Sequence, residues 1–359
     1  MLRSSFRVLL MLTVAAASPA LARGEWVYAI SKSGNSLVRF NSANTVNVAD
    51  TAQTTPVTTL FAGLAQPAGM ALGPDGRLYI AEWGDGGGVG PRISRYDITT
   101  GQWAPVVSLN QSTQAQPSAI AFRPAGLGGQ MLVGRVGTLG GSGQGGIVQV
   151  SGWNTGSPSV AASPYNSGIT LNGSSGLAVA ADGTTYVSNS QYVQFGEFPV
   201  FIGNVVSLNA TGGFVREIAA DGSFTGGLTG PAGLILQGSS LFIGSVTNGR
   251  VYQTTNLSAS PPTTTEFGSL GPDAGFEAGP ILRLSNGSTL VASVSGSGVI
   301  SMLGPTGTLS PLGYYAPEFG QIGGIVVAPV PEPGSIALTV AGLGGLGWCL
   351  RRRRRGRSS

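Results

Sequence analysis

Short apolar segments separated by small polar residues follow one another along residues 26–328. One arrangement recurs: a segment that opens with small residues continues into a few apolar positions, and a turn separates it from a second apolar segment. The first copy consists of segment 67–72, turn 73–76 and segment 78–80. Because short apolar runs bounded by Gly, Asn and Asp are typical of β-strands, we predict antiparallel strand pairs.

This arrangement occurs in five copies and opens a sixth. Each copy has a small residue, usually glycine, at one shared position; these positions are Gly69, Ala119, Gly176, Gly233, Gly279 and Gly324. They lie 45 to 57 residues apart. That spacing is typical of the four-stranded blades of a β-propeller with loop insertions.

The sixth copy, at 322–327, is not followed by a second strand. The missing continuation lies at the other end of this region, in segments 26–30 and 36–40. We therefore predict an all-β, six-bladed β-propeller in which the N- and C-terminal strands close one blade and hide the edges of an open sheet. The alternative, a pair of β-sandwiches, would require no shared repeat.

The Pro-Asp-Gly turn at 74–76 and the paired strands resemble the NHL and gluconolactonase-type propeller superfamily over residues 26–328. The resemblance implies the six-bladed fold. Gluconolactonase-type enzymes hold a divalent metal with carboxylates and amides, and here the match is partial. Ser175 stands where that pattern favours asparagine, and Ser245 where it favours aspartate.

Residues 1–22 have the three parts of a secretory signal peptide. Arg3 and Arg7 precede an apolar stretch, and the small residues Ala20 and Ala22 form the predicted cleavage site. The alternative is a buried N-terminal helix. We expect the domain order to be signal peptide 1–22, propeller 23–328 and a C-terminal segment 329–359.

The C-terminal segment also has three parts. The residues Pro331, Glu332 and Pro333 are followed by an apolar run at 334–350, which is near the lower length limit for crossing a membrane as a helix. An arginine cluster comes next: Arg351, Arg352, Arg353, Arg354 and Arg355. By the positive-inside rule this cluster would stay in the cytoplasm.

This order of parts closely resembles the PEP-CTERM sorting signal of Gram-negative bacteria. The resemblance implies signal peptidase and exosortase as partners during export, and transient insertion into the inner membrane. It further implies delivery to the cell surface or the extracellular matrix, often together with exopolysaccharide. A plain C-terminal anchor is the alternative, although it does not explain the Pro-Glu-Pro motif.

Composition narrows the chemistry available to the predicted propeller. The chain contains no histidine and one cysteine, so His-dependent triads, His-ligated metals and Cys-x-x-Cys sites are excluded. Charged residues are only 9% of the chain, and Lys32 is its single lysine. Without the two arginine-bearing ends the net charge is about −3, so no nucleic-acid partner is expected.

Antiparallel strands bring the start of each inner strand and the end of the second strand to one face of the disc. We predict that polar residues at these positions surround the central channel. Glu82, Asn189 and Glu277 are the candidate metal ligands, because oxygen donors suit a divalent cation such as calcium. No other cofactor is expected, and simple solvation of the channel mouth is the alternative.

The candidate ligand-binding residues on the same face are Gln66, Trp83, Asp85, Gln116, Arg135, Tyr192 and Phe195. Aromatic rings with polar neighbours suit carbohydrate, whose apolar faces stack on them. The alternative is that the aromatic residues of 191–198 pack onto their own blade.

Two functions remain open. The sorting signal and the absence of a matched catalytic set favour a non-catalytic binding or scaffold protein at the cell surface, with exopolysaccharide as the candidate partner. The alternative is a metal-dependent lactonase or hydrolase of the gluconolactonase-like propeller type, which would use Glu82, Asn189 and Glu277.

Overall fold

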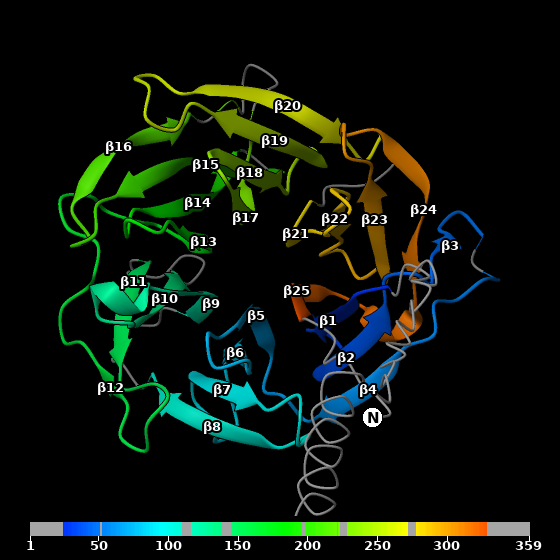
Figure 1. The fold of residues 1–359 in the computed structure, drawn as a ribbon, viewed down its shortest axis with the longest axis horizontal. Coiled ribbons are helices and arrows are strands. Elements are labelled where there is room, and N and C mark those ends of the chain that lie inside the picture. The colour runs from blue at the N-terminus through cyan, green and yellow to red at the C-terminus, as the bar shows by residue number, and fades with distance from the viewer. Residues whose placement is uncertain are drawn as a thin grey trace, which may run out of the picture.

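The computed structural model describes residues 24–328 except 51, 110–115, 138–144, 196–197, 221, 223–227 and 272–277. The described residues form six antiparallel sheets arranged as blades around a central axis (Figure 1). The predicted signal peptide, the Pro-Glu-Pro motif and the apolar segment 334–350 lie outside the described residues. Within the described residues no helix is long and apolar enough to cross a membrane.

Each blade has four strands that follow one another from the axis outward. The first and second complete blades contain β5 (Pro67–Leu72), β6 (Leu78–Glu82), β7 (Arg92–Tyr96) and β8 (Trp103–Ser108), then β9 (Gln116–Phe122), β10 (Met131–Val136), β11 (Gly146–Ser151) and β12 (Ser159–Val160). The third contains β13 (Ser174–Val179), β14 (Thr185–Phe195), β15 (Phe198–Leu208) and β16 (Phe214–Ala219).

The fourth blade contains β17 (Pro231–Gln237), β18 (Ser240–Ser245), β19 (Arg250–Thr255) and β20 (Thr263–Ser269). The fifth contains β21 (Ile281–Arg283), β22 (Thr289–Ala292), β23 (Val299–Leu303) and β24 (Leu309–Tyr315), with β3 (Val46–Asn47) added at its outer edge. Two short 3-10 helices, Ala125–Leu127 and Pro317–Phe319, lie in connections.

The sixth blade joins the two ends of the propeller, as predicted. Its inner strand is β25 (Ile322–Ala328), which pairs antiparallel with β1 (Trp26–Ser31); β2 (Ser36–Asn41) and β4 (Thr58–Ala62) complete the blade. In Figure 1 the orange β25 lies beside the blue β1. The six-bladed fold is therefore confirmed and the alternative of two sandwiches is wrong.

The repeated small residue marks the place where inner strands of neighbouring blades approach each other. A Cβ atom at Gly69 or Gly176 would overlap the backbone carbonyl oxygen of Ser118 or Ala232 in the next blade. The second blade has Ala119 at this position, and its cross-strand partner Gly134 makes the close approach instead. The small residue therefore recurs in the sequence because the close approach of neighbouring blades leaves no room for a larger side chain.

Apolar side chains fill the spaces between blades. Tyr79 of the first blade meets Phe122 and Trp153 of the second, with ring centroids 5.2 Å from Tyr79 in both cases and edge-on geometry. Phe40, Tyr314 and Phe319 similarly join the sixth blade to the fifth. These contacts pack neighbouring blades against each other.

Candidate functional site: the mouth of the central channel

A cavity of about 1270 Å³ runs between the inner strands of all six blades. We call the upper face the side of the disc where inner strands begin and second strands end. The lower part of the cavity is lined mainly by apolar side chains, among them Met70, Leu72, Ile120, Leu234 and Val326. Most polar side chains of the lining lie at the upper end, among them Lys32, Gln116, Asn172, Ser175, Ser190, Gln191 and Gln321, with Trp83 beside them. The cavity therefore has a polar mouth and an apolar body.

β-Bulges shape this mouth. The pairing of inner and second strands shifts by a residue near the upper face in five of the blades, for example between Pro67 and Gly69 and between Ser174 and Gly176. Each bulge leaves an extra residue, such as Ser175, without a cross-strand partner. Bulges commonly re-aim side chains beside binding sites, and here Ser175 lines the cavity.

The polar residues predicted at the ends of the second strands do not line the channel, and the residue that follows each of them does. Glu82, Arg135 and Asn189 are absent from the described lining, whereas the next residues, Trp83, Val136 and Ser190, belong to it. We call the channel-lining set the upper ring, and it consists of Lys32, Trp83, Val136, Ser190, Val246 and Val294. Successive side chains of a strand point to opposite faces, so a one-residue error exchanges the two sets.

Glu82 has a structural environment. Its side chain is fully buried, and Arg92 binds both carboxylate oxygens, with Nε 3.1 Å from Oε1 and Nη2 2.9 Å from Oε2. The backbone N–H of Ala65 donates a third hydrogen bond to Oε2 at 2.6 Å. These donors already satisfy the carboxylate, which leaves it poorly suited to bind a metal.

Asn189 is also engaged away from the channel. Its Oδ1 accepts a hydrogen bond from the Asn172 backbone at 2.8 Å, and its Nδ2 donates to Asn204 Oδ1 at 3.2 Å. The third predicted ligand, Glu277, lies outside the described residues. Among the residues that the structure describes, no three His, Cys, Asp or Glu side chains gather as metal ligands. The metal site thus stays a prediction that the described geometry does not support.

The predicted ligand-binding residues have diverse positions. Trp83 and Gln116 line the cavity. Gln66 is exposed, and its backbone carbonyl accepts a hydrogen bond from the backbone N–H of Trp83 at 3.1 Å. Arg135 is only 9% exposed, and burial lowers the pKa of its guanidinium. Asp85 is exposed and lies outside the described cavity lining.

Asp85 stabilises its own loop. Its Oδ1 accepts the backbone N–H groups of Gly87 at 2.8 Å and Val89 at 2.9 Å, and these donors lower the pKa of the carboxyl group. Tyr192 and Phe195 lie on β14, opposite Phe201 and Phe198 of β15. Their side chains are outside the described part of the structure, so their predicted roles stay predictions.

Lys32 is the residue that sequence reasoning missed. It lies in the turn between β1 and β2, and its Nζ is 3.4 Å from the centroid of the Trp83 ring. The Trp83 indole is itself fixed, because its Nε1 donates to the Pro117 carbonyl at 2.8 Å. Burial lowers the pKa of the Lys32 ammonium group. Its sequence signal was its uniqueness, since the chain has no other lysine.

A serine cluster forms another part of the wall. Ser175 Oγ is 3.0 Å from Ser190 Oγ and donates to the Pro231 carbonyl at 3.1 Å, while Ser188 Oγ donates to the Ala232 carbonyl at 2.9 Å. The cluster therefore joins the third blade to the bulge of the fourth. Ser245, by contrast, is fully buried and bonded to Thr229, away from the cavity lining.

Amide side chains complete the mouth. Asn172 Nδ2 donates to Gln191 Oε1 at 3.1 Å, and Gln116 and Gln321 line other sectors. Each amide offers both donors and an acceptor. This arrangement can orient a neutral polar ligand without acid–base chemistry.

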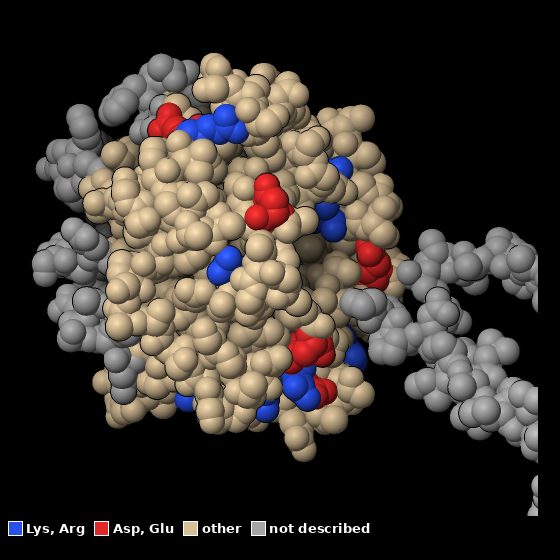
Figure 2. All heavy atoms as spheres, turned by 60° about the vertical axis from the view of Figure 1, so that its left-hand side comes forward, with Lys and Arg blue, Asp and Glu red and all other residues tan. Residues whose placement is uncertain are grey.

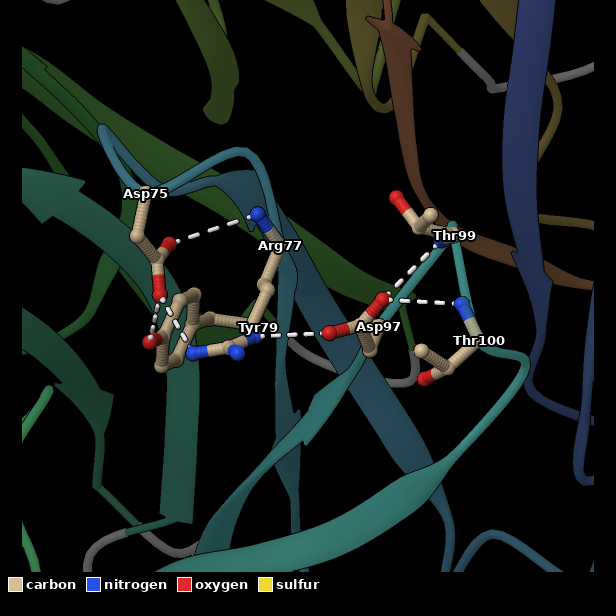
Figure 3. Close-up of polar contacts among 6 residues, drawn as sticks. All are labelled: Asp75, Arg77, Tyr79, Asp97, Thr99 and Thr100. Atoms are coloured by element: carbon tan, nitrogen blue, oxygen red, sulfur yellow. Dashed lines mark hydrogen bonds and ion pairs between the residues drawn. The ribbon is translucent and has the colours of Figure 1, made fainter.

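The lower face carries a different polar cluster, which Figure 3 shows. Arg77 Nε is 3.0 Å from Asp97 Oδ2 and its Nη1 is 3.4 Å from Asp75 Oδ2, while Tyr79 OH donates to Asp75 at 2.9 Å. The backbone N–H groups of Thr99 and Thr100 and the Arg77 guanidinium hold the pKa of Asp97 at about 2. The cluster fastens the β5–β6 turn to the β7–β8 turn.

Elsewhere charge is sparse. On the surface shown in Figure 2 the acidic and basic side chains are few and lie in small separate groups. The described ion pairs are those of Arg77, of Arg92 with Glu82, and of Arg250 with Glu266 at 3.0 Å. Against this background, a lysine at the channel mouth is distinctive.

Comparison with solved structures finds the same fold at low identity. A structure of a nidogen/laminin complex contains a chain with a TM-score of 0.59 and 12% identity, covering 85% of this chain and 98% of that one. A Bacteroides caccae protein of unknown function gives 0.54 and 12%, covering 85% and 99%. The PQQ-bound aldose sugar dehydrogenase of Streptomyces coelicolor gives 0.53 and 16%, covering 75% and 84%. These likenesses show the fold alone.

A comparison with curated proteins found no match. A family model, the PEP-CTERM protein-sorting motif, matches residues 329–354. The match covers the Pro-Glu-Pro motif, the apolar run and Arg351 to Arg354. The chain is therefore a β-propeller joined to a PEP-CTERM sorting motif, which implies export, processing by an exosortase and sorting to the bacterial surface.

Proposed function

We propose that this propeller is a non-catalytic binding protein, displayed at the cell surface or in the extracellular matrix, which holds a glycan at the mouth of its central channel. The observation that carries the proposal is the mouth itself: amide side chains and Trp83 surround one end of a cavity of about 1270 Å³. Exopolysaccharide is the candidate ligand, because it is available where the sorting motif directs the protein.

The chemistry of the mouth supports a sugar ligand. Sugar hydroxyls both donate and accept hydrogen bonds, as do the side chains of Gln116, Asn172, Gln191 and Gln321. The apolar face of a sugar ring suits an aromatic neighbour such as Trp83. Specific pockets commonly combine apolar walls with a few placed polar groups, which is the arrangement that lines this cavity.

The proposed export route begins with signal peptidase cleavage after Ala22. Segment 334–350 then holds an inner-membrane intermediate of a Gram-negative cell, with the arginine cluster on the cytoplasmic side. The exosortase removes this segment, and the propeller reaches the surface or the matrix. Intact-mass measurement of the surface protein should give a C-terminus near 330–333, and recovery of the full tail would instead favour a permanent anchor.

Binding can be tested with protein recovered from the cell surface and with exopolysaccharide from the same cells. The double variant Gln116→Ala/Gln321→Ala should weaken binding by about tenfold or more, because it removes two sets of hydrogen bonds at the mouth. Gln237→Ala, at the lower end of β17, is the matched control. Equal binding by the wild type and the double variant would contradict the proposal.

The lactonase alternative is tested on the same sample. Elemental analysis of the surface protein should find no stoichiometric divalent metal, and Glu277→Gln should leave its metal content unchanged. A bound metal that this substitution removes would favour the metal-dependent enzyme.

A further inference from the structure

The environment of Lys32 distinguishes one sector of the mouth from the rest. The ammonium group lies over the Trp83 ring, and no carboxylate of the described residues forms an ion pair with it. Arg77, Arg92 and Arg250 each meet a carboxylate within 3.0 Å. Arg39, Arg123 and Arg283, like Lys32, lie over aromatic rings and have no described ion pair. Lys32, the single lysine of the chain, differs from these arginines because it lines the central cavity, whereas none of them belongs to its described lining.

The other members of the upper ring are neutral. Val136, Ser190, Val246 and Val294 carry no charge, and the polar lining is otherwise made of amides and hydroxyls. A half-buried cation loses part of its hydration, and an aromatic face compensates only partly for that loss. An anionic group of a ligand could pair with the Lys32 ammonium group and replace the hydration that it has lost.

We infer that the glycan bound at this mouth is acidic, and that Lys32 binds the carboxylate of a hexuronic acid residue while Trp83 and the neighbouring amides contact its ring. This inference rests on the proposed function and names the ligand class for the same site. Charge-assisted hydrogen bonds between an ammonium and a carboxylate are stronger than neutral ones, so the acidic group would supply much of the selectivity.

The unique lysine provides a direct reporter. When the exported protein is labelled with [13C,15N]-lysine, the side-chain NMR signals come from Lys32 alone. Trigalacturonate should shift the Cε and Hε signals in a saturable way. The fully methyl-esterified trisaccharide keeps the rings and loses the charge, so it should bind about tenfold more weakly. A sulfated cellotriose tests whether another anion is preferred.

Variants separate charge from shape. Lys32→Met keeps an unbranched apolar stem over Trp83 and should abolish the preference for trigalacturonate over its ester, measured by calorimetry. Lys32→Arg should retain that preference, because it keeps the positive charge. Arg250→Met, which removes an exposed cation paired with Glu266, is the matched control and should bind like the wild type.

Equal affinity for the acid and its ester would overturn the inference, as would tighter binding of the sulfated sugar or an unaltered preference in Lys32→Met. These outcomes leave the broader proposal intact, because that proposal depends on the loss of exopolysaccharide binding in Gln116→Ala/Gln321→Ala. Loss of binding in that double variant, with no effect of charge, would identify a neutral-glycan site.

Discussion

Two cations, one at each face of the disc, have opposite environments. On the lower face Arg77 lies between Asp75 and Asp97, so its charge fastens two turns of the same blade (Figure 3). At the upper mouth Lys32 faces the Trp83 ring and no described carboxylate. The ion pairs of Arg92 and Arg250 resemble that of Arg77, although they lie near the upper face. The contrast is therefore between cations paired within the blades, which stabilise the fold, and Lys32, which lines the cavity and is available to a ligand. The following substitutions test this distinction.

The largest effect should come from the inner strands, which support both faces. In Gly176→Ala the new Cβ would overlap the Ala232 carbonyl oxygen of the next blade, so we expect a loss of about 3 kcal/mol in the free energy of unfolding. Gly126→Ala meets no atom within 4 Å and is the control. Denaturant unfolding measures both; similar stability of the two variants would show that the ring tolerates wider spacing.

Glu82→Gln should have the next largest effect. The substitution leaves the guanidinium of Arg92, which is 18% exposed, without its charged partner. Because glutamine keeps one acceptor oxygen but loses the charge, this substitution should cost about 2 kcal/mol. Glu266→Gln, which breaks the exposed pair with Arg250, should cost less than about 1 kcal/mol. Thermal unfolding at neutral pH compares them. A Glu82 variant as stable as the Glu266 variant, together with a loss of bound metal, would restore the metal-ligand role.

Acid should weaken the lower face. The pKa of Asp97 is about 2, below its ordinary value of 3.8, because backbone N–H groups and Arg77 stabilise the carboxylate. The stabilisation is therefore present above pH 3.8 and is lost as the pH falls toward 2. Asp97→Asn should unfold at a lower temperature than the wild type at pH 6, and the two should converge near pH 2. Parallel curves over this range would assign the acid response to other groups.

Lys32→Met should have the smallest effect on stability. The substitution removes a favourable contact between the ammonium group and the Trp83 ring, and it also removes the cost of desolvating that charge. The free energy of unfolding should therefore change by less than about 0.5 kcal/mol. The same variant should lose its preference for trigalacturonate over the methyl ester. A large destabilisation would show that Lys32 stabilises the fold in the way that Arg77 does, and the contrast between the two cations would disappear.

The blades and their closure were predictable because both rest on local chemistry. Glycine recurs where the inner strands of neighbouring blades approach closely, because a Cβ atom at Gly69, Gly176 or Gly324 would overlap atoms of the next blade. The spacing of these glycines therefore indicates the spacing of the blades. The complementary strands at 26–30 and 322–327 indicated the closed blade. The Pro-Glu-Pro motif, apolar run and arginine cluster likewise need no tertiary contact to be recognised.

The channel lining depended on tertiary structure. A strand exposes alternate residues to opposite faces, and the bulges near the upper face shift the pairing by one position, so sequence alone could not tell whether Glu82 or Trp83 faces the axis. The ring places Trp83 there and buries Glu82 against Arg92. The closed ring also places the turn after β1 beside the end of β6, so that Lys32 lies over the Trp83 ring. Strand chemistry therefore determined the blades, and only the closing of the ring decided which side chains meet at its mouth.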